Sequence, residues 1–584
     1  MNKFFLLPVA CMLIIACSEP RPESMSINGV WKFKTGDSAA WSDPAFNDSA
    51  WDTIRAGKDF ESQGVGKYDG IAWYRKSVVI PSSMKKGLSS NYPNLYIILG
   101  KIDDADQVFL NGQFIGSTGS MEKNDEISYS TERKYLIGLE QIKWDAENVI
   151  AVRVNDFSGN GGLYKGPYEI HTACIRDYAV IRQDVKSETG VFNKGEKVML
   201  QVKILSSAPE KIKGSILYTI SRDTHEPLET KTLAYSVNKA DSAVVDIAFD
   251  APAAGFYQVN YVCSMNGIDS AMTDSTWFGY DPASLNCGTS RPADFEEYWA
   301  KAKKELAEVK PRFTTTLSNE WSNDSVTVYE VEMYSLGNVR VGGWYSVPKK
   351  LDKSKKLPTL LRQIGYSGNN MPVTDRPQFA VLSFNIRGHG NSKKDVNPGF
   401  PQYIGTNIDN KETYIYRGAY MDCIRAVDFL CSRPEVDTSR IAVYGGSQGG
   451  ALSFATAALD SRVDLCAPHI PFLSDFRDYF KIVSFPRTFI EDYRKEHPGI
   501  TDDQMFTTLD YIDIRNLAPW IHVPTFMGVG LIDRICPPHI NFVAFNNIAC
   551  PDKQWFVFKK NGHSVPASQH KAELEWIKMK FGMK

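Results

Sequence analysis

The sequence predicts three consecutive domains, two built from β-strands and a third in which strands alternate with helices. The chain of 584 residues is longer than one hydrophobic core normally organises. Up to about residue 280, apolar and polar residues alternate in short segments, which is typical of half-buried strands. Beyond that point, short apolar runs are separated by segments with helical spacing, which favours a largely parallel sheet covered on both faces.

The N-terminal segment predicts a signal peptide over residues 1–16, followed by a linker over 17–25. It is apolar, has a lysine near its start and is too short to span a bilayer comfortably. Ile14, Ile15 and the small residue Ala16 precede Cys17 and a polar stretch follows it, which resembles a bacterial lipoprotein processing site. The resemblance implies that lipid is attached to Cys17 and holds the protein in the bacterial cell envelope, periplasmic or at the outer-membrane surface. A plain signal peptide with an incidental cysteine is the alternative.

The composition is that of an ordinary globular protein, with 43% apolar and 23% charged residues. A formal net charge of -2 gives no electrostatic reason to expect nucleic acid as a partner, and a membrane is expected only through the lipid anchor. The ten cysteines contain no C-x-x-C pair, which predicts buried free thiols. We expect neither a metal nor an organic cofactor.

Residues 26–177 are rich in tryptophan and turn-forming residues, and the segments 95–99 and 149–154 have the apolar character of strands. This pattern indicates a β-sandwich. Three phrases carry a resemblance: W-Y-R-K (73–76), D-D-A-D-Q-V-F-L-N-G (103–112) and E-N-V-I-A-V-R-V (147–154). They resemble the galactose-binding-like jelly roll at the N-terminus of glycoside hydrolase family two enzymes. Such a domain often serves only as a structural support, so no sugar-contacting residue is assigned.

Residues 178–284 alternate again, for example over 198–204 and 256–262. About one hundred residues of short strands without a cluster of catalytic residue types are typical of an immunoglobulin-like β-sandwich. We expect this domain to act as a spacer.

Residues 285–584 open with a helical pattern over 291–309 and then alternate between strands and helices. Strands are expected at 359–361, 380–384, 441–444, 525–529 and 555–558, and helices at 420–431 and 450–459.

A G-x-S-x-G motif stands between one of these strands and a helix. The apolar segment 441–444 runs directly into G-G-S-Q-G (445–449), with Ser447 at the centre. This strand, turn and helix order is the context that the nucleophile elbow of an α/β-hydrolase requires. Glycines two before and two after the serine let the backbone turn sharply. The sequence therefore predicts an α/β-hydrolase domain with Ser447 as the nucleophile.

A serine hydroxyl needs a base to accept its proton and a carboxylate to orient that base. His563 follows the strand 555–558 in a short loop, whereas His570 falls in the expected terminal helix, so His563 is the predicted base. Asp533 follows the strand 525–529 and is the predicted acid. Asp552, in a more solvent-like setting, is the alternative acid.

An acyl-transfer enzyme also needs N–H donors directed at the developing oxyanion. The backbone N–H of Gln448, directly after the nucleophile, is one natural donor. The loop after the strand 359–361 can supply the second, for which we choose the N–H of Tyr366; a simple turn is the alternative interpretation of that loop.

Several spaced motifs in one order carry a resemblance that covers the last three hundred residues. They are G-G-W-Y-S-V-P (342–348), G-Y-S-G (365–368), N-I-R-G-H-G-N-S (385–392), Y-R-G-A-Y-M-D-C-I-R-A-V-D-F-L (416–430), S-R-P-E-V-D (432–437), G-G-S-Q-G-G (445–450) and D-R-I-C-P-P (533–538). The region resembles carbohydrate esterase family seven, the acetyl xylan esterases and cephalosporin C deacetylases. The resemblance implies Ser447, Asp533 and His563 as the triad, with Tyr366 and Gln448 supplying the oxyanion hole.

Three local sequences depart from the family pattern. His389 stands where members usually have the glutamine of R-G-Q, Ile364 where they have the histidine of H-G-Y, and Ser564 where a glutamate follows the catalytic histidine. None removes a triad member. We interpret His389 as a structural loop residue, with a second catalytic histidine as the alternative.

The predicted function is removal of acetyl groups from hydroxyls of xylan-type oligosaccharides or related sugars. One alternative is a non-catalytic glycan-binding lipoprotein on an esterase scaffold, and another is an α/β-hydrolase peptidase with the same triad. Because relatives of the esterase domain commonly form hexamers, a homo-oligomer is also possible.

Overall fold

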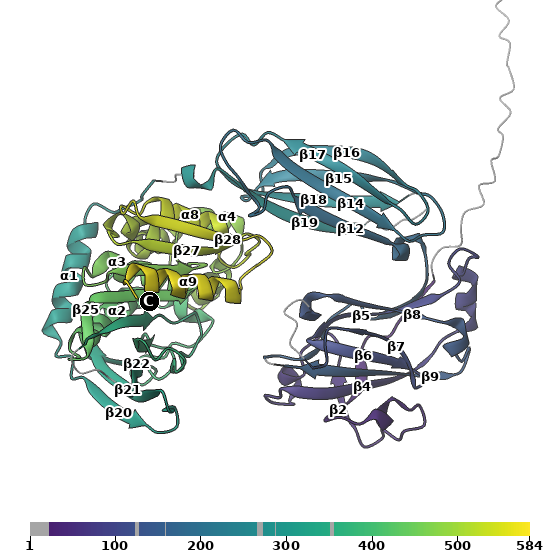
Figure 1. Ribbon diagram of the computed structural model, residues 1–584, viewed down its shortest axis with the longest axis horizontal. Helices are drawn as coiled ribbons and strands as arrows, with labels where there is room; N and C mark the ends of the chain where they lie inside the picture. The colour runs from purple at the N-terminus through teal and green to yellow at the C-terminus, as the bar shows by residue number, and fades with distance from the viewer. Residues whose placement is uncertain are drawn as a thin grey trace, which may run out of the picture.

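The computed structural model describes residues 23–122, 128–157, 159–265, 272–285, 288–350 and 355–583. Cys17 lies outside these residues, as do the predicted signal peptide and most of the predicted linker. Three units follow one another along the chain, with a β-sandwich between an N-terminal β-sandwich and a C-terminal α/β unit (Figure 1). No helix in the described ranges combines the length and the apolar character needed to cross a membrane.

The N-terminal unit is a pair of packed antiparallel sheets. One sheet consists of β1 (Ser24–Ser26), β11 (Glu169–Thr172), β5 (Leu95–Asp103), β10 (Gly162–Lys165) and β8 (Glu132–Ile137). The other consists of β3 (Asp52–Arg55), β2 (Val30–Thr35), β4 (Gly70–Val79), β9 (Glu147–Asp156), β6 (Ala105–Leu110) and β7 (Gln113–Thr118). Alternate residues of both sheets point inward and form one apolar core, as period-two patterning requires. Because β1 pairs with β11, this unit begins two residues before its predicted start.

The middle unit is also a two-sheet sandwich with its own core. A three-stranded sheet consists of β12 (Ala179–Val185), β14 (Val198–Ser206) and β17 (Ser242–Phe249). A five-stranded sheet consists of β13 (Val191–Phe192), β19 (Met272–Tyr280), β18 (Gly255–Met265), β15 (Ile212–Arg222) and β16 (Pro227–Val237). The sandwich architecture is as expected; its immunoglobulin-like character stays a prediction.

The C-terminal unit is built on one nine-stranded sheet. Its strands, in spatial order, are β20 (Thr314–Ser318), β21 (Val326–Ser335), β22 (Val339–Pro348), β24 (Ala380–Asn385), β23 (Leu357–Arg362), β25 (Val436–Gly446), β26 (Leu465–His469), β27 (Thr525–Gly530) and β28 (Lys553–Phe558). The pairings from β20 to β24 are antiparallel, and those from β24 to β28 are parallel. The parallel part confirms the fold expected of alternating strands and helices.

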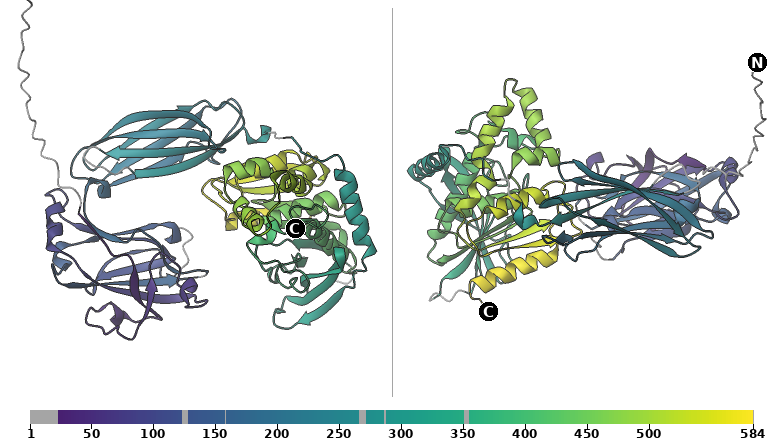
Figure 2. Two further views of the ribbon diagram at one scale, coloured as in Figure 1. Left: turned by 180° about the vertical axis from the view of Figure 1, so that it is seen from behind. Right: turned by 90° about the horizontal axis from the view of Figure 1, so that it is seen from above.

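Helices cover both faces of this sheet. They are α1 (Phe295–Glu308), α2 (Ile415–Cys431), α3 (Gln448–Leu459), α4 (Phe476–Ile482), α5 (Arg487–Glu496), α6 (Asp502–Ile512), α7 (Ile514–Leu517), α8 (Pro538–Asn546) and α9 (Ala567–Lys580). Adjacent residues of one strand belong to different cores: Ala442 packs in the core that includes Trp576 of α9, and Val443 packs in the core that includes α2 and α3. In Figure 2, α4–α6 project from one side of the unit and α9 lies on the other.

The middle sandwich packs against the C-terminal unit rather than only leading to it. The ammonium of Lys559 donates to Oδ1 of Asp184 at 2.8 Å and to the carbonyls of Val185 and Ser187 at 2.6 and 2.8 Å. The ring of Phe256 lies 5.5 Å from that of Phe542 and belongs to the C-terminal core. The expected spacer is therefore also a structural part of the C-terminal unit.

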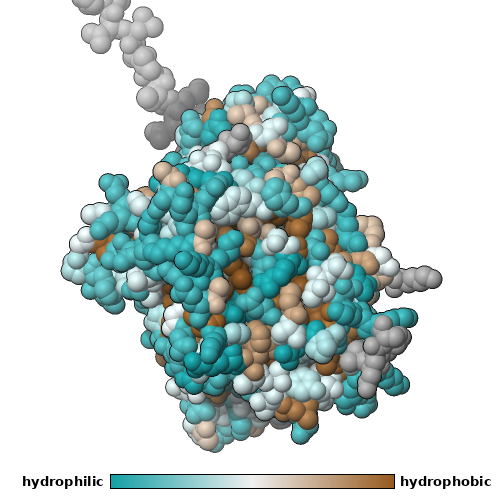
Figure 3. Space-filling model, turned by 90° about the vertical axis from the view of Figure 1, so that its left-hand side faces the viewer, coloured by the Kyte–Doolittle hydropathy of each residue, from teal (hydrophilic) through white to brown (hydrophobic). Residues whose placement is uncertain are grey.

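The face in Figure 3 is mostly hydrophilic, with apolar residues scattered between polar ones. The seven cysteines within the described ranges whose state the structure gives are free thiols. Five of the cysteines whose state the structure gives are buried, as predicted, and Cys174 and Cys431 are half-buried.

Candidate active site

Ser447 lies at the turn between β25 and α3 in a strained backbone conformation, with φ 56° and ψ -121°. A residue with a Cβ rarely adopts positive φ, and such strain is concentrated at functional sites. The neighbouring glycines are needed for space. A Cβ on Gly445 would lie 2.9 Å from the carbonyl carbon of Gly449, and one on Gly449 would lie 2.7 Å from the carbonyl oxygen of Gln363. The motif thus has the geometry of a nucleophile elbow.

The three predicted triad side chains meet at this turn. Nε2 of His563 lies 3.0 Å from Oγ of Ser447, and Nδ1 of the same ring lies 2.8 Å from Oδ2 of Asp533. If Nδ1 carries the proton and donates it to the carboxylate, Nε2 is left with a lone pair directed at the serine hydroxyl. This tautomer is the one that can accept the proton of Ser447.

Backbone N–H groups hold the second carboxylate oxygen of Asp533, Oδ1, by hydrogen bonds. Oδ1 accepts hydrogen bonds from the N–H groups of Ile535 at 2.7 Å and Cys536 at 2.9 Å. The carboxylate is fully buried, whereas the His563 side chain is 26% exposed. The acid is therefore fixed inside the protein while the base and the serine stay partly accessible to a substrate.

The alternative residues occupy other places. Asp552 pairs with the ammonium of Lys580 at 2.5 Å. His570 lies in α9, as expected, against the ring of His469. Neither has a contact with Ser447 among the described residues.

Gln448 and Tyr366 both lie next to the elbow. Gln448 is the first residue of α3, so its backbone N–H has no carbonyl partner within the helix. Its side-chain amide donates to the carbonyl of Ile364 at 3.3 Å, which holds the loop after β23 against the start of α3. The ring of Tyr366 contacts Phe472, whose N–H donates to the carbonyl of Ser447 at 3.1 Å. Both predicted oxyanion donors thus come from segments that border Ser447.

A buried network fixes the side chain of Gln448. The hydroxyl of Tyr416 donates to Oε1 of Gln448 at 2.7 Å, so the amide Nε2 is left to donate to Nε2 of His389 at 3.0 Å. His389 can accept this bond only as a neutral imidazole, protonated at Nδ1 and directed at the carbonyl of Arg387. Burial lowers the pKa of His389 to about 4, which keeps the ring neutral. His389 is buried and contacts the residue that follows Ser447; its role as a structural loop residue stays a prediction.

Sequence reasoning missed Cys536 as a neighbour of the nucleophile. Its sulfur lies 3.9 Å from Oγ of Ser447 and 3.9 Å from the hydroxyl of Tyr479. Burial raises the pKa of the Cys536 thiol, so the thiol stays protonated and uncharged beside the serine. The position of this cysteine three residues after Asp533 was visible in the sequence, but its contact with Ser447 depends on the loop conformation.

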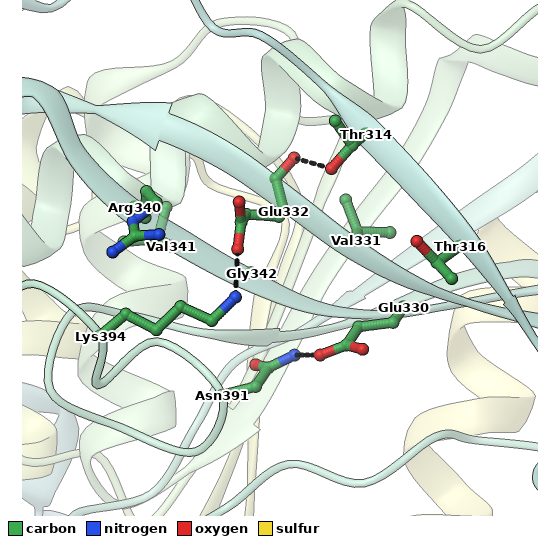
Figure 4. Close-up of a pocket in the computed structure, with 10 residues that line it drawn as sticks. All are labelled: Thr314, Thr316, Glu330, Val331, Glu332, Arg340, Val341, Gly342, Asn391 and Lys394. Carbon is green, nitrogen blue, oxygen red and sulfur yellow. Dashed lines mark hydrogen bonds and ion pairs between the residues drawn. The ribbon is translucent and has the colours of Figure 1, made fainter.

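A separate polar pocket of about 180 Å³ lies at the antiparallel end of the sheet (Figure 4). Its charged groups are paired locally: Lys394 binds Glu332 at 2.5 Å, and Asn391 donates to Glu330 at 3.2 Å. None of the candidate catalytic residues lines it.

The parallel sheet, the strained serine turn and the Ser–His–Asp arrangement define an α/β-hydrolase with the geometry of a serine esterase. Residues 285–580 match the family described as acetyl xylan esterase (AXE1), and residues 35–160 match the beta-galactosidase second all-beta domain. Because the first match covers about half of the chain, the protein belongs to the acetyl xylan esterase family. It is a carboxylic ester hydrolase.

The chain is also similar to individual named proteins. Acetyl esterase Axe7A of Xylanibacter ruminicola is 25% identical over 316 residues, which are 51% of this chain and 70% of that protein. A solved acetyl xylan esterase from a Paenibacillus species is 32% identical and matches 51% of this chain and 98% of its own, with a TM-score of 0.48. Acetyl xylan esterase 1 from a Thermoanaerobacterium species is 29% identical. The match covers 51% of this chain and 96% of that chain, with a TM-score of 0.47.

Proposed function

We propose that this protein is a serine carbohydrate esterase that removes acetyl groups from xylan-type oligosaccharides or related acetylated sugars. The observation that carries the proposal is the continuous hydrogen-bonded series from Asp533 through His563 to Ser447. It stands in a domain of the acetyl xylan esterase family, and the relative from Xylanibacter ruminicola is named an acetyl esterase.

The first half of the proposed reaction forms an acetyl-enzyme. Oγ of Ser447 attacks the acetyl carbonyl carbon while its proton passes to Nε2 of His563, and Asp533 stabilises the resulting imidazolium. The backbone N–H groups of Gln448 and Tyr366 bind the oxyanion, and each such donor typically lowers the barrier by about 3 to 4 kcal/mol. The bond to the sugar oxygen then breaks, and His563 returns the proton to that oxygen.

The second half restores the enzyme. A water molecule loses a proton to His563 and attacks the acetyl carbonyl of the acylated serine. The bond to Oγ breaks, the proton returns from His563 to Ser447, and acetate leaves. These steps use only protein groups and water.

Acetate release from acetylated xylo-oligosaccharide tests the proposal. We expect wild type to release acetate and Ser447→Ala to lose activity by a factor of roughly 10⁴ to 10⁶. Ser439→Ala, which changes an exposed serine near the start of β25, is the matched control and should keep full activity. Absence of release by folded wild type on every acetylated sugar tried would favour a non-catalytic glycan-binding protein.

The bond that is cleaved needs a separate comparison. An acetyl ester and a peptide anilide offered side by side distinguish an esterase from a peptidase with the same triad. We expect the ester to be preferred, because the family relatives are named as esterases. Faster hydrolysis of the anilide would contradict the proposal.

The location of the protein is part of the same proposal. The small residue Ala16 directly before Cys17, the apolar run that leads to it and the polar stretch after it support a lipid anchor in the bacterial envelope. Cys17→Ser should move the protein from the detergent phase to the aqueous phase in a phase-partition experiment, and an unchanged distribution would refute the anchor.

Light scattering on the soluble form tests whether the chain forms a homo-oligomer.

A further inference from the structure

A cluster of metal-binding residue types lies beside the nucleophile elbow. His469 ends β26, and His570 and Glu573 stand three residues apart on α9, a spacing that puts them on one helix face. Each offers one ligand atom, and these atoms lie within 4.8 Å of one another. Nδ1 of His469 lies 3.0 Å from Oε2 of Glu573, and the two imidazole rings are 5.3 Å apart.

The carboxylate of this cluster is only partly compensated. Glu573 is 1% exposed, and its Oε1 has no hydrogen-bond partner among the described residues. A buried carboxylate oxygen without a partner costs free energy unless a cation or a donor faces it. A metal ion between the carboxylate and the imidazoles supplies that compensation, whereas the contact with His469 uses only one of the two oxygens.

The site has an access route and a free position. His469 and His570 line a cavity of about 630 Å³, together with the side chains of Arg362 and Arg376. His570 is exposed and lines this cavity, so a metal ion can reach its ring from solvent. Two imidazoles and one carboxylate suit zinc and leave a fourth position for water or an anion from the cavity.

We propose that His469, His570 and Glu573 bind a divalent transition-metal ion, with zinc as the ion that fits this set of ligands. The site touches the nucleophile elbow through His469. A Cβ on Gly446 would lie 2.6 Å from the His469 ring, and the carbonyl of His469 accepts the N–H of Ser447 at 3.0 Å. A bound ion therefore fixes the residue that supports the strained turn, without joining the acyl-transfer steps. Binding of the ion at this site is independent of which ester is cleaved.

Zinc binding by the full chain tests the site. Protein stripped with EDTA is dialysed against zinc, and the bound metal is measured by mass spectrometry in wild type, His570→Ala and Glu573→Gln. His570 is exposed, so its alanine variant is expected to fold, which circular dichroism checks. His497→Ala, at an exposed position after α5, is the matched control.

We expect wild type and the control to retain one more zinc per chain than either variant, and zinc to raise Tm only in the first two proteins. Cobalt in place of zinc should give the strong visible absorption of a four-coordinate site, and His570→Ala should abolish it. Equal zinc content in all four proteins would overturn the proposal and leave the hydrogen bond between His469 and Glu573 as the role of the cluster. Retention of zinc by Glu573→Gln but not by His570→Ala would also overturn the assignment of Glu573 as a ligand.

Discussion

Nε2 of His389 lies 3.0 Å from the side-chain amide nitrogen of Gln448, the residue that directly follows Ser447. Since the amide must donate, the imidazole must accept, and only a neutral ring can do so. Protonation would place two donors against each other under the elbow. The protonation state of one buried histidine is thereby linked to the position of a predicted oxyanion donor.

This link predicts an acid-sensitive stability. The pKa of His389 falls from 6.5 to about 4 because the ring is buried. The folded state therefore binds fewer protons than the unfolded state, so the contribution to stability is complete above pH 6.5 and is lost as pH falls to about 4. At about 1.4 kcal/mol per pKa unit, the loss is about 3 kcal/mol. Denaturant unfolding of wild type and His389→Gln at pH 7 and pH 4.5 measures it.

In the glutamine variant, the free energy of unfolding should decrease much less between pH 7 and pH 4.5 than in wild type, because the amide does not titrate. His497→Gln, which changes an exposed histidine, should behave as wild type. If His389→Gln and wild type lose the same stability on acidification, the acid sensitivity comes from other groups.

A change of the acid distinguishes the two aspartates considered from the sequence. Asp533→Asn should lower kcat by roughly 10² to 10⁴, because the amide can hold the imidazole in the wrong tautomer. Asp552→Asn should leave kcat unchanged, since Asp552 pairs with Lys580 rather than with His563. Steady-state kinetics on an acetyl ester measures both variants. Equal loss in the two variants would remove Asp533 from its predicted role.

Gly449, the last glycine of the nucleophile motif, is expected to tolerate no side chain. Gly449→Ala puts a Cβ 2.7 Å from the carbonyl of Gln363, so the loop that carries Tyr366 must shift. We expect the free energy of unfolding to fall by about 1 to 3 kcal/mol and kcat to fall at least tenfold. Gly365→Ala meets no atom within 4 Å and should keep the stability of wild type. Full activity of Gly449→Ala would show that this loop does not supply a donor.

The contact of Lys559 with the middle sandwich is expected to matter for catalysis. Lys559 begins the loop that leads to His563, and its ammonium is held by three acceptors of that sandwich. Lys559→Met should lower kcat by roughly tenfold, because small displacements of a catalytic group are costly. Lys560→Met, at the exposed neighbouring position, should not. Thermal unfolding and steady-state kinetics of the two variants measure the effect. Equal Tm and kcat in both variants would show that the loop keeps its conformation without the contact of Lys559.

Local sequence was enough to predict many secondary-structure elements and the order of the three domains along the chain. Residues 441–444 are apolar, a glycine-flanked serine follows and a helical pattern comes next, so the turn at Ser447 could be predicted without tertiary information. The expected strands at 95–99 and 198–204 lie within β5 and β14. The roles of Ser447, Asp533 and His563 stay predictions, but the structure places their side chains in contact.

Contacts between distant segments could not be predicted in this way. His389 and Gln448 are 59 positions apart, and His469 and Glu573 are 104 apart, so no local pattern connects them. Each pairing depends on loops whose conformation follows from packing. The same reason explains why three residues scattered over two elements gave no metal signal in the sequence.

The aromatic ring of Phe256 belongs to the middle sandwich by position in the chain and to the hydrolase core by packing. A segment excised at residue 285 would therefore leave an unfilled space beside Phe542. Gene shuffling that replaced the preceding sandwich would have to restore an aromatic side chain at the same place. The folding unit of this esterase is therefore larger than the region that matches its family. Transfer of its activity to another chain requires the middle sandwich and the C-terminal unit together.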